Sequence, residues 1–127
     1  MDNIANMITA IRNAGAISKE KIEVPYSKMS LNVLSLLKEE GYIKAVHDKK
    51  DEYKIEVVLE YGNKGIPKIQ ELKRISKPGR RVYYKITDIK KVKNGYGNVV
   101  LSTPQGIMTG RTARSKNTGG EALFEIF

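Results

Sequence analysis

The spacing of apolar residues in the first half of the chain constrains the fold more than any other feature of the sequence. Apolar side chains at positions 4, 7, 8 and 11 stand at i, i+3, i+4 and i+7, which places them on one stripe of a helix. From Tyr53 to Tyr61, in contrast, apolar residues occupy every second position, as in a strand with one buried face. The fold must therefore combine helices with a half-covered sheet.

Three further segments complete this half of the chain. KIEVP, residues 21–25, alternates apolar and charged residues and is expected to be a strand. Positions 29, 33, 36 and 37 form a second helical stripe, which ends at Gly41. YIKAV and EYKIEVVLEY flank the polar turn HDKKD, in which His47 is expected to be exposed. The order of elements is thus helix, strand, helix and hairpin.

The pattern breaks at GNKGIP, residues 62–67. This segment combines two glycines, an asparagine and a proline at the point where the charge balance changes sign. We predict a linker there, between an N-terminal α/β domain of residues 1–62 and a basic, β-rich C-terminal domain of residues 63–127. The expected fold class is α+β with two small domains.

The second half is expected to be mostly β with short helices. KIQELKRIS and RRVYYK flank Pro78-Gly79, the residue order of a type II turn, which predicts a hairpin. Basic residues that we expect to contact phosphates lie near its tip: Lys77, Arg80 and Arg81. A helical turn is expected from Thr87 to Val92. The strand NVVLS then leads through the loop STPQG to a short helix, RTARSK, capped by Thr109.

Positive charge is concentrated in one half of the chain. The formal net charge is +9, but residues 1–62 carry nine Lys and Arg against ten Asp and Glu, whereas residues 63–127 carry fourteen against four. A charge that served only solubility would be spread over the chain, so this distribution favours a polyanionic partner, with nucleic acid ahead of an anionic membrane surface. The alternative is that these basic residues form a solvated surface that binds no partner.

Composition limits the other chemistry available. The chain has no cysteine, which excludes disulfides and thiolate metal sites, and its single histidine leaves carboxylates as the main metal ligands. We expect no metal and no cofactor. No apolar run approaches the roughly 18 residues of a membrane-spanning helix, and the opening lacks the basic end and apolar stretch of a signal peptide. We expect a cytoplasmic protein without a membrane partner.

The loop STPQG and the helix after it carry residues suited to RNA. Ser, Thr and Gln side chains donate and accept hydrogen bonds toward base edges and ribose 2′-hydroxyls, while arginines hold phosphates or stack. One surface is expected to carry these candidates: Ser102, Thr103, Gln105, Gly106, Thr109, Arg111 and Arg114. Ser, Thr, Pro and Gly are also ordinary turn formers, so the loop also fits a plain connector.

The pair Gly119-Gly120 has two explanations. Glycines end helices and permit positive φ, which would explain the pair by backbone geometry alone. Residues without a Cβ also let the backbone approach a ligand closely, with Glu121 as an acceptor beside the basic surface. Both explanations can hold together.

Five blocks of the sequence, in order and in register over nearly the whole chain, carry a resemblance to a known family. They are NIANMITAIRNA, PYSKMS, LLKEEGYI, RISKPGRRVY, and LSTPQGIMTGRTAR followed by GGE. The chain resembles bacterial small-subunit ribosomal protein eight, of the universal family uS8. The resemblance implies a two-domain α+β protein that is not an enzyme and that binds the central domain of small-subunit rRNA directly and early in assembly, beside neighbouring small-subunit ribosomal proteins. In some bacteria, the family also represses translation of its own operon's mRNA.

The resemblance also implies which residues face RNA. The family's Ser-Thr-x-x-Gly loop falls on Ser102, Thr103 and Gly106, and its Gly-Gly-Glu block falls on Gly119, Gly120 and Glu121. A second contact from the N-terminal domain would involve Arg12, Asn13 and Lys28.

The chain departs from the family pattern at several positions. The family usually has Ser where this chain has Pro104, and often Lys and Asp where it has Gln105 and Gly110. The family also opens with Ile-Ala-Asp, whereas this chain has Ile4, Ala5 and Asn6. Pro104 brings neither a hydroxyl nor an N–H, although its fixed φ stiffens the loop. Pro104 therefore cannot make the hydrogen bonds that a serine would make at that position.

Two other functions remain as alternatives. A small hydrolase would use Ser102 or Thr103 as nucleophile, but it needs a base, and the one histidine lies in another segment, which leaves a lysine. An RNA-binding translational regulator outside the ribosome is the nearer alternative. Co-sedimentation with small ribosomal subunits separates these functions from the expected one.

Overall fold

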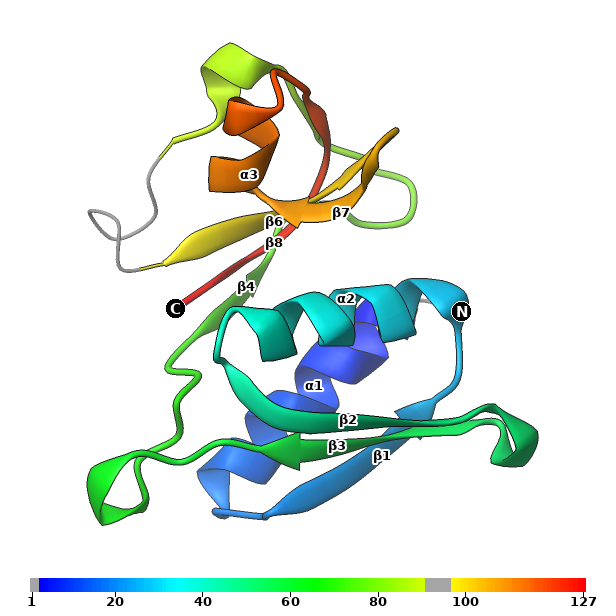
Figure 1. Ribbon diagram of the computed structural model, residues 1–127, viewed down its shortest axis with the longest axis vertical. Coiled ribbons are helices and arrows are strands. Elements are labelled where there is room, and N and C mark those ends of the chain that lie inside the picture. The colour runs from blue at the N-terminus through cyan, green and yellow to red at the C-terminus, as the bar shows by residue number, and fades with distance from the viewer. Residues whose placement is uncertain (1–2, 91–96) are drawn as a thin grey trace. The chain divides into compact units, whose positions relative to one another are not determined.

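The computed structural model describes residues 3–90 and 97–127, which form two compact units (Figure 1). The chain passes from the first unit to the second between Gln70 and Glu71. Each unit combines helices with an antiparallel sheet, which confirms the predicted α+β class. The linker predicted at residues 62–67 stays a prediction. The Lys68 N–H donates to the Glu60 carbonyl, which ties the chain just after this segment to the first unit.

The first unit has the predicted order of helix, strand, helix and hairpin. Its helices are α1 (Asn3–Ala16) and α2 (Lys28–Glu39). Its sheet has the order β1-β3-β2, with β1 (Lys21–Pro25), β2 (Ile43–Lys49) and β3 (Lys54–Leu59). Two short 3₁₀ turns, η1 (Lys50–Glu52) and η2 (Asn63–Gly65), follow β2 and β3.

Apolar stripes on both helices build the core of the first unit. The four apolar residues of the α1 stripe are buried, as predicted, and α1 and α2 contact each other and the sheet. Ser27 caps α2, since its Oγ accepts from the Ser30 N–H at 3.0 Å, and Gly41 ends the helix with a φ of 84°. The buried apolar residues on the sheet are Ile22, Val24, Ile43, Ile55, Val57, Val58 and Leu59.

The strand pattern that begins at Tyr53 in the sequence holds only from Ile55 onward. Tyr53 follows η1 in a left-handed conformation, with a φ of 57°, and is 85% exposed. Its N–H donates to the Lys50 carbonyl, and its own carbonyl accepts from the Tyr26 N–H. The geometry of the turn therefore overrides the alternation. His47 lies within β2 rather than in the turn, with its side chain 56% exposed.

The second unit is mostly β with short helices, as predicted. Its strands are β4 (Leu72–Arg74), β5 (Tyr83–Tyr84), β6 (Asn98–Thr103), β7 (Gly106–Thr109) and β8 (Gly120–Ile126). The sheet has the order β4-β8-β6-β7, and β5 also pairs with β8. The helical elements are η3 (Ile86–Asp88) and α3 (Gly110–Ser115). The helical turn expected from Thr87 is η3, and its expected end at Val92 lies outside the described residues.

The turn predicted at Pro78-Gly79 is present, but the predicted hairpin is limited to one antiparallel bridge between Lys77 and Arg80. The Arg80 N–H donates to the Lys77 carbonyl at 3.0 Å, and Gly79 has the positive φ, 81°, of a type II turn. The flanking strands β4 and β5 each pair with β8 and not with each other. This pairing partner lies near the end of the chain, where local sequence around the turn gives no sign of it.

One face of the second sheet is covered by α3. A buried cluster joins Ala113 of α3 to residues of β6, β7 and β8, and Ile75 and Tyr84 pack against it. The other members of this cluster are Ile89, Val99, Leu101, Met108 and Ala122. Within residues 3–90 and 97–127, no helix has both the length and the apolar character that crossing a membrane requires.

Candidate nucleic-acid interface

Strand pairing brings four side chains of the second unit into one row across the sheet. Tyr83 of β5 pairs with Glu121 of β8, Glu121 pairs with Ser102 of β6, and Ser102 pairs with Ile107 of β7. Directly paired residues point to the same face of a sheet. The next residues along β6 and β7 belong to the core under α3, so this row, called the Ser102 row below, lies on the opposite face.

The Ser102 row offers three kinds of chemistry at the surface. Tyr83 is 69% exposed, Ser102 and Ile107 are half-buried, and the Glu121 side chain is 16% exposed. An exposed aromatic ring stacks on bases, a hydroxyl donates and accepts, and a carboxylate accepts. Sequence reasoning missed Tyr83, because the adjacent Tyr84 has the same chemistry and only the pairing with β8 shows which ring is exposed.

The carboxylate of Glu121 is held by two other side chains of the second unit. The hydroxyl of Ser76, which is fully buried, donates to Glu121 Oε2, and Arg81 Nη1 lies 3.1 Å from the same oxygen. Ser76 Oγ in turn accepts from the Val82 N–H at 3.2 Å. Arg81 is thus oriented by an ion pair with a residue of the Ser102 row.

The predicted loop STPQG is a tight β-hairpin. The strand β6 continues to Thr103 and β7 starts at Gly106, so Pro104 and Gln105 alone form the turn. Thr103 Oγ1 donates to the Gly106 carbonyl at 2.8 Å and accepts from the Gln105 N–H at 3.1 Å. The two adjacent hydroxyls therefore differ: Thr103 holds the turn, whereas Ser102 lies in the row.

Gly119 and Gly120 are required by the close approach of neighbouring strands. A Cβ on Gly119 would lie 2.3 Å from the Tyr84 carbonyl oxygen, and a Cβ on Gly120 would lie 2.3 Å from that of Ser102. Neither glycine has a positive φ, and the left-handed residue after α3 is Asn117. Backbone geometry thus explains the pair through strand packing rather than through a helix end.

The short helix and its cap form as predicted. Thr109 Oγ1 accepts from the Thr112 N–H at 3.3 Å, and Thr109 is buried, so its hydroxyl serves the helix. Both arginines of α3 are exposed, and Arg114 also donates through Nη2 to the Ile89 carbonyl. Because α3 covers the core face, the structure does not place these arginines on the face that carries Ser102.

Gly110, where the family usually has Asp, is the first residue of α3 and is buried. A Cβ there would lie 2.6 Å from Val99 Cγ1 and 2.8 Å from Ile89 Cγ2. The absence of a Cβ at Gly110 therefore lets α3 pack closely against Val99 and Ile89.

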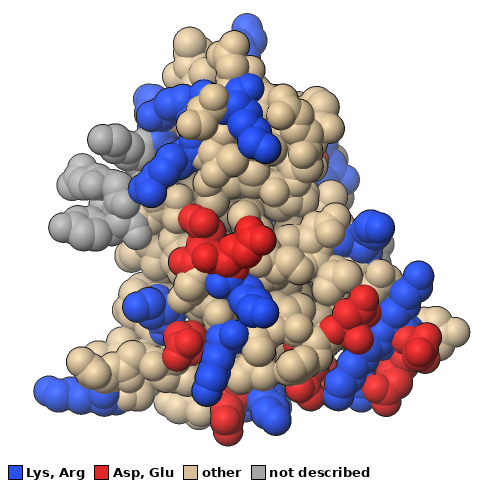
Figure 2. Space-filling view, viewed as in Figure 1, with Lys and Arg blue, Asp and Glu red and all other residues tan. Residues whose placement is uncertain are grey.

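Further exposed cations surround this site within the second unit. Lys77, Arg80 and Arg81 lie at the turn after β4, and all three are exposed. In the view of Figure 2, other Lys and Arg side chains of the second unit lie around α3, which covers the face of the sheet opposite the Ser102 row. The candidates of the first unit, Arg12 and Asn13 on α1 and Lys28 at the start of α2, are exposed as well.

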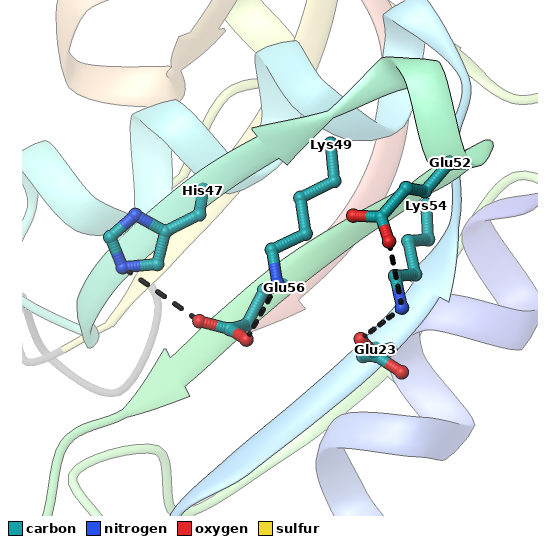
Figure 3. Close-up of polar contacts among 6 residues, drawn as sticks. All are labelled: Glu23, His47, Lys49, Glu52, Lys54 and Glu56. Atoms are coloured by element: carbon teal, nitrogen blue, oxygen red, sulfur yellow. Dashed lines mark hydrogen bonds and ion pairs between the residues drawn. The ribbon is translucent and has the colours of Figure 1, made fainter.

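The charged residues on the sheet of the first unit are arranged differently. Figure 3 shows Glu56 between Lys49, at 3.2 Å, and His47, at 3.9 Å. Lys54 Nζ lies 2.8 Å from Glu23 and 3.9 Å from Glu52. The hydrogen bond from Lys49 lowers the pKa of Glu56, and the bond to Glu23 raises the pKa of Lys54. These lysines are matched by carboxylates of neighbouring strands.

Metal chemistry has no visible site in the part of the chain that the structure describes. No group of three or more His, Asp or Glu side chains there is arranged to hold a metal ion.

Comparison with known proteins decides the family. The model of the family described as Ribosomal protein S8 matches residues 2–127. The chain belongs to this family. The small ribosomal subunit protein uS8 of Nitrobacter hamburgensis is 47% identical over 129 residues, which cover 99% of this chain and 97% of that protein. Proteins of the same name from Afipia carboxidovorans and Rhodopseudomonas palustris match over the same shares at the same identity.

Family membership confirms the resemblance carried by the five sequence blocks. The ribosomal protein S8 family is a family of structural ribosomal proteins, so the chain is not an enzyme and the hydrolase alternative is set aside.

Proposed function

We propose that this member of the S8 family is a structural constituent of the small ribosomal subunit in the cytoplasm. It binds the central domain of small-subunit rRNA directly, helps it to assemble, and contacts neighbouring small-subunit proteins. The observation that carries the proposal is the Ser102 row, in which strand pairing aligns an exposed ring, a hydroxyl and a held carboxylate.

The chemistry of the row supports RNA as the partner. Ser102 and Glu121 can pair with base edges and ribose 2′-hydroxyls, and Tyr83 can stack on an unpaired base. Protein surfaces that read RNA combine such groups with cations for the phosphates. In this chain the exposed cations at the turn beside the row are Lys77, Arg80 and Arg81, whereas Arg111 is exposed on α3, which covers the other face of the sheet.

The remaining candidates have other roles. Thr103, Gln105 and Gly106 fix the hairpin beside Ser102, and Gly119 and Gly120 allow the strands to come close. Thr109 and Arg114 hold α3 in place. A second contact is assigned to Arg12, Asn13 and Lys28 of the first unit. A natural extension is repression of the protein's own operon mRNA, if that mRNA presents the same donors and phosphates.

Filter binding to a fragment of central-domain rRNA tests this function directly. We expect affinity for this fragment to exceed that for an unrelated RNA duplex of equal length by at least about a hundredfold at moderate salt, because base-edge and ribose contacts add to the phosphate contacts. Equal affinities would contradict the proposal.

Co-sedimentation gives the second readout. The tagged protein should migrate with small ribosomal subunits in a density gradient and remain there after a moderate salt wash. Specific RNA binding without co-sedimentation would instead favour a translational regulator that acts outside the ribosome.

A further inference from the structure

Glu121 is a carboxylate in the middle of a surface suited to a polyanion. It stands between Tyr83 and Ser102 in the Ser102 row. Phosphates repel a carboxylate, so this position calls for a partner that donates hydrogen bonds.

The contacts of Glu121 show that its orientation is controlled. Ser76 Oγ donates to Oε2, and the same Oγ accepts from the Val82 N–H. The Ser76 N–H donates to the Ala122 carbonyl at 3.1 Å, which fixes the serine against β8 itself. Arg81 adds a contact of 3.1 Å to the same Oε2. Ser76 is fully buried, so its hydroxyl is committed to this arrangement.

Both contacts fall on Oε2, and Oε1 is the remaining acceptor of the carboxylate. An ionised carboxylate accepts hydrogen bonds and donates none. The positive charge of Arg81 offsets part of the repulsion between Glu121 and nearby RNA phosphates. The hydrogen-bond donors that RNA offers are base N–H groups and ribose 2′-hydroxyls. An exposed ion pair contributes little to stability. The ion pair alone therefore does not explain why a buried serine also orients this carboxylate.

We propose that Ser76 and Arg81 are positioning residues that hold the Glu121 carboxylate so that Oε1 accepts a hydrogen bond from a base N–H or a ribose 2′-hydroxyl of RNA. This inference rests on the proposed function, which already gives Glu121 a contact with RNA, and adds the two residues that orient its carboxylate. Glu121 selects RNA that places a donor at one position, and Ser76 and Arg81 act on RNA through Glu121.

A donor scan of the RNA tests the proposal. A synthetic central-domain rRNA fragment is prepared with single substitutions, each of which removes one 2′-hydroxyl or one base amino group. With the parent protein, we expect one substitution near Glu121 to weaken binding on the order of tenfold, as for the loss of one charge-assisted hydrogen bond. With Glu121→Ala, the same substitution should cause no further loss.

The positioning residues are tested at the same RNA position. Ser76→Ala and Arg81→Gln should each lose most of the sensitivity to the missing donor, and Ser76→Ala should keep the salt dependence of the parent. Two matched controls should keep full sensitivity: Arg80→Gln, which removes the same charge one residue away, and Ser115→Ala, which removes an exposed hydroxyl at the end of α3.

The outcomes separate this inference from the proposed function. Undiminished sensitivity in Arg81→Gln, or in a Ser76→Ala variant whose melting curve shows that it folds, overturns the inference. A scan in which no donor depends on Glu121 overturns it as well. A parent protein that binds the fragment no better than an unrelated duplex refutes the proposed function instead.

Discussion

The two units of this protein use the same charged residue types in opposite ways. On the sheet of the first unit, Lys49 and Lys54 face carboxylates of neighbouring strands, and the charges largely cancel (Figure 3). In the second unit, residues 71–127 carry twelve Lys and Arg against four Asp and Glu, so the acids are too few to match the cations. One of those acids, Glu121, is itself held by Arg81 and Ser76.

This difference shows that net charge alone does not locate a binding surface. Exposed ion pairs contribute little to stability, but they do satisfy the charges that take part in them. Cations without a matching acid attract a polyanion over a distance of about one Debye length. The second unit is therefore the expected centre of RNA binding, and the contact proposed for the first unit is expected to be smaller.

The largest expected effect comes from the close strand contact in the second unit. In Gly120→Ala, the new Cβ would meet the Ser102 carbonyl oxygen at 2.3 Å, so β6 and β8 must separate. We expect the free energy of unfolding to fall by roughly 2–3 kcal/mol. The affinity for RNA should fall as well.

Gly62→Ala is the matched control in the first unit, because its Cβ would meet its nearest neighbour, the Ile66 carbonyl oxygen, at 3.7 Å. Its unfolding free energy should stay within about 0.5 kcal/mol of the parent. Denaturant unfolding measures both variants, and equal losses in the two would break the comparison.

A smaller effect separates the two hydroxyls of the hairpin. Ser102→Ala should weaken binding to the central-domain fragment by about 1–1.5 kcal/mol without changing the melting temperature, because Ser102 lies in the row. Thr103→Val should instead lower stability by about 1 kcal/mol, because the hydrogen bonds to Gly106 and Gln105 are lost. Filter binding and thermal melting of both variants provide the test, and parent-like binding by Ser102→Ala would make the hairpin a plain connector.

The smallest expected effect concerns the ion pairs of the first unit. Lys49 lowers the pKa of Glu56 from its ordinary value of 4.5, so ionisation of Glu56 favours the folded state above that pH. The contribution is lost as the pH falls through the lowered pKa. Glu56→Gln should therefore be slightly less stable than the parent at neutral pH and equal to it in strong acid. Urea unfolding at both pH values checks this, and a difference that persists in acid would contradict it.

Local patterns in the sequence predicted much of the fold. The helical stripe of α1, the cap at Thr109 and the turn at Gly79 depend on residues within a few positions of each other, and all three form as expected. Pairing over long sequence distances was not predictable in this way. The sequence predicted no strand at β7, and the hairpin predicted around Pro78-Gly79 paired β5 with β4 instead of β8.

The candidate site shows the same limit. Residue chemistry and the family resemblance both indicated Ser102 and Glu121, whereas their alignment with Tyr83 follows from the pairing of three strands. Ser76 gave no signal, because a serine before a lysine-proline turn is an ordinary turn residue. Its role is visible only where its hydroxyl meets Glu121.

Salt dependence of rRNA binding tests the central claim most directly. Two triple variants remove three positive charges each: Lys77, Arg80 and Arg111 to Gln in the second unit, and Lys38, Lys44 and Lys50 to Gln in the first, all at exposed positions. The slope of log K against log salt for the central-domain fragment should fall by roughly two in the first variant, since each phosphate contact contributes about 0.7 to 0.9. The second variant should keep the slope of the parent. Equal reductions in both variants, or a larger one in the second, would contradict the assignment of RNA binding to the second unit.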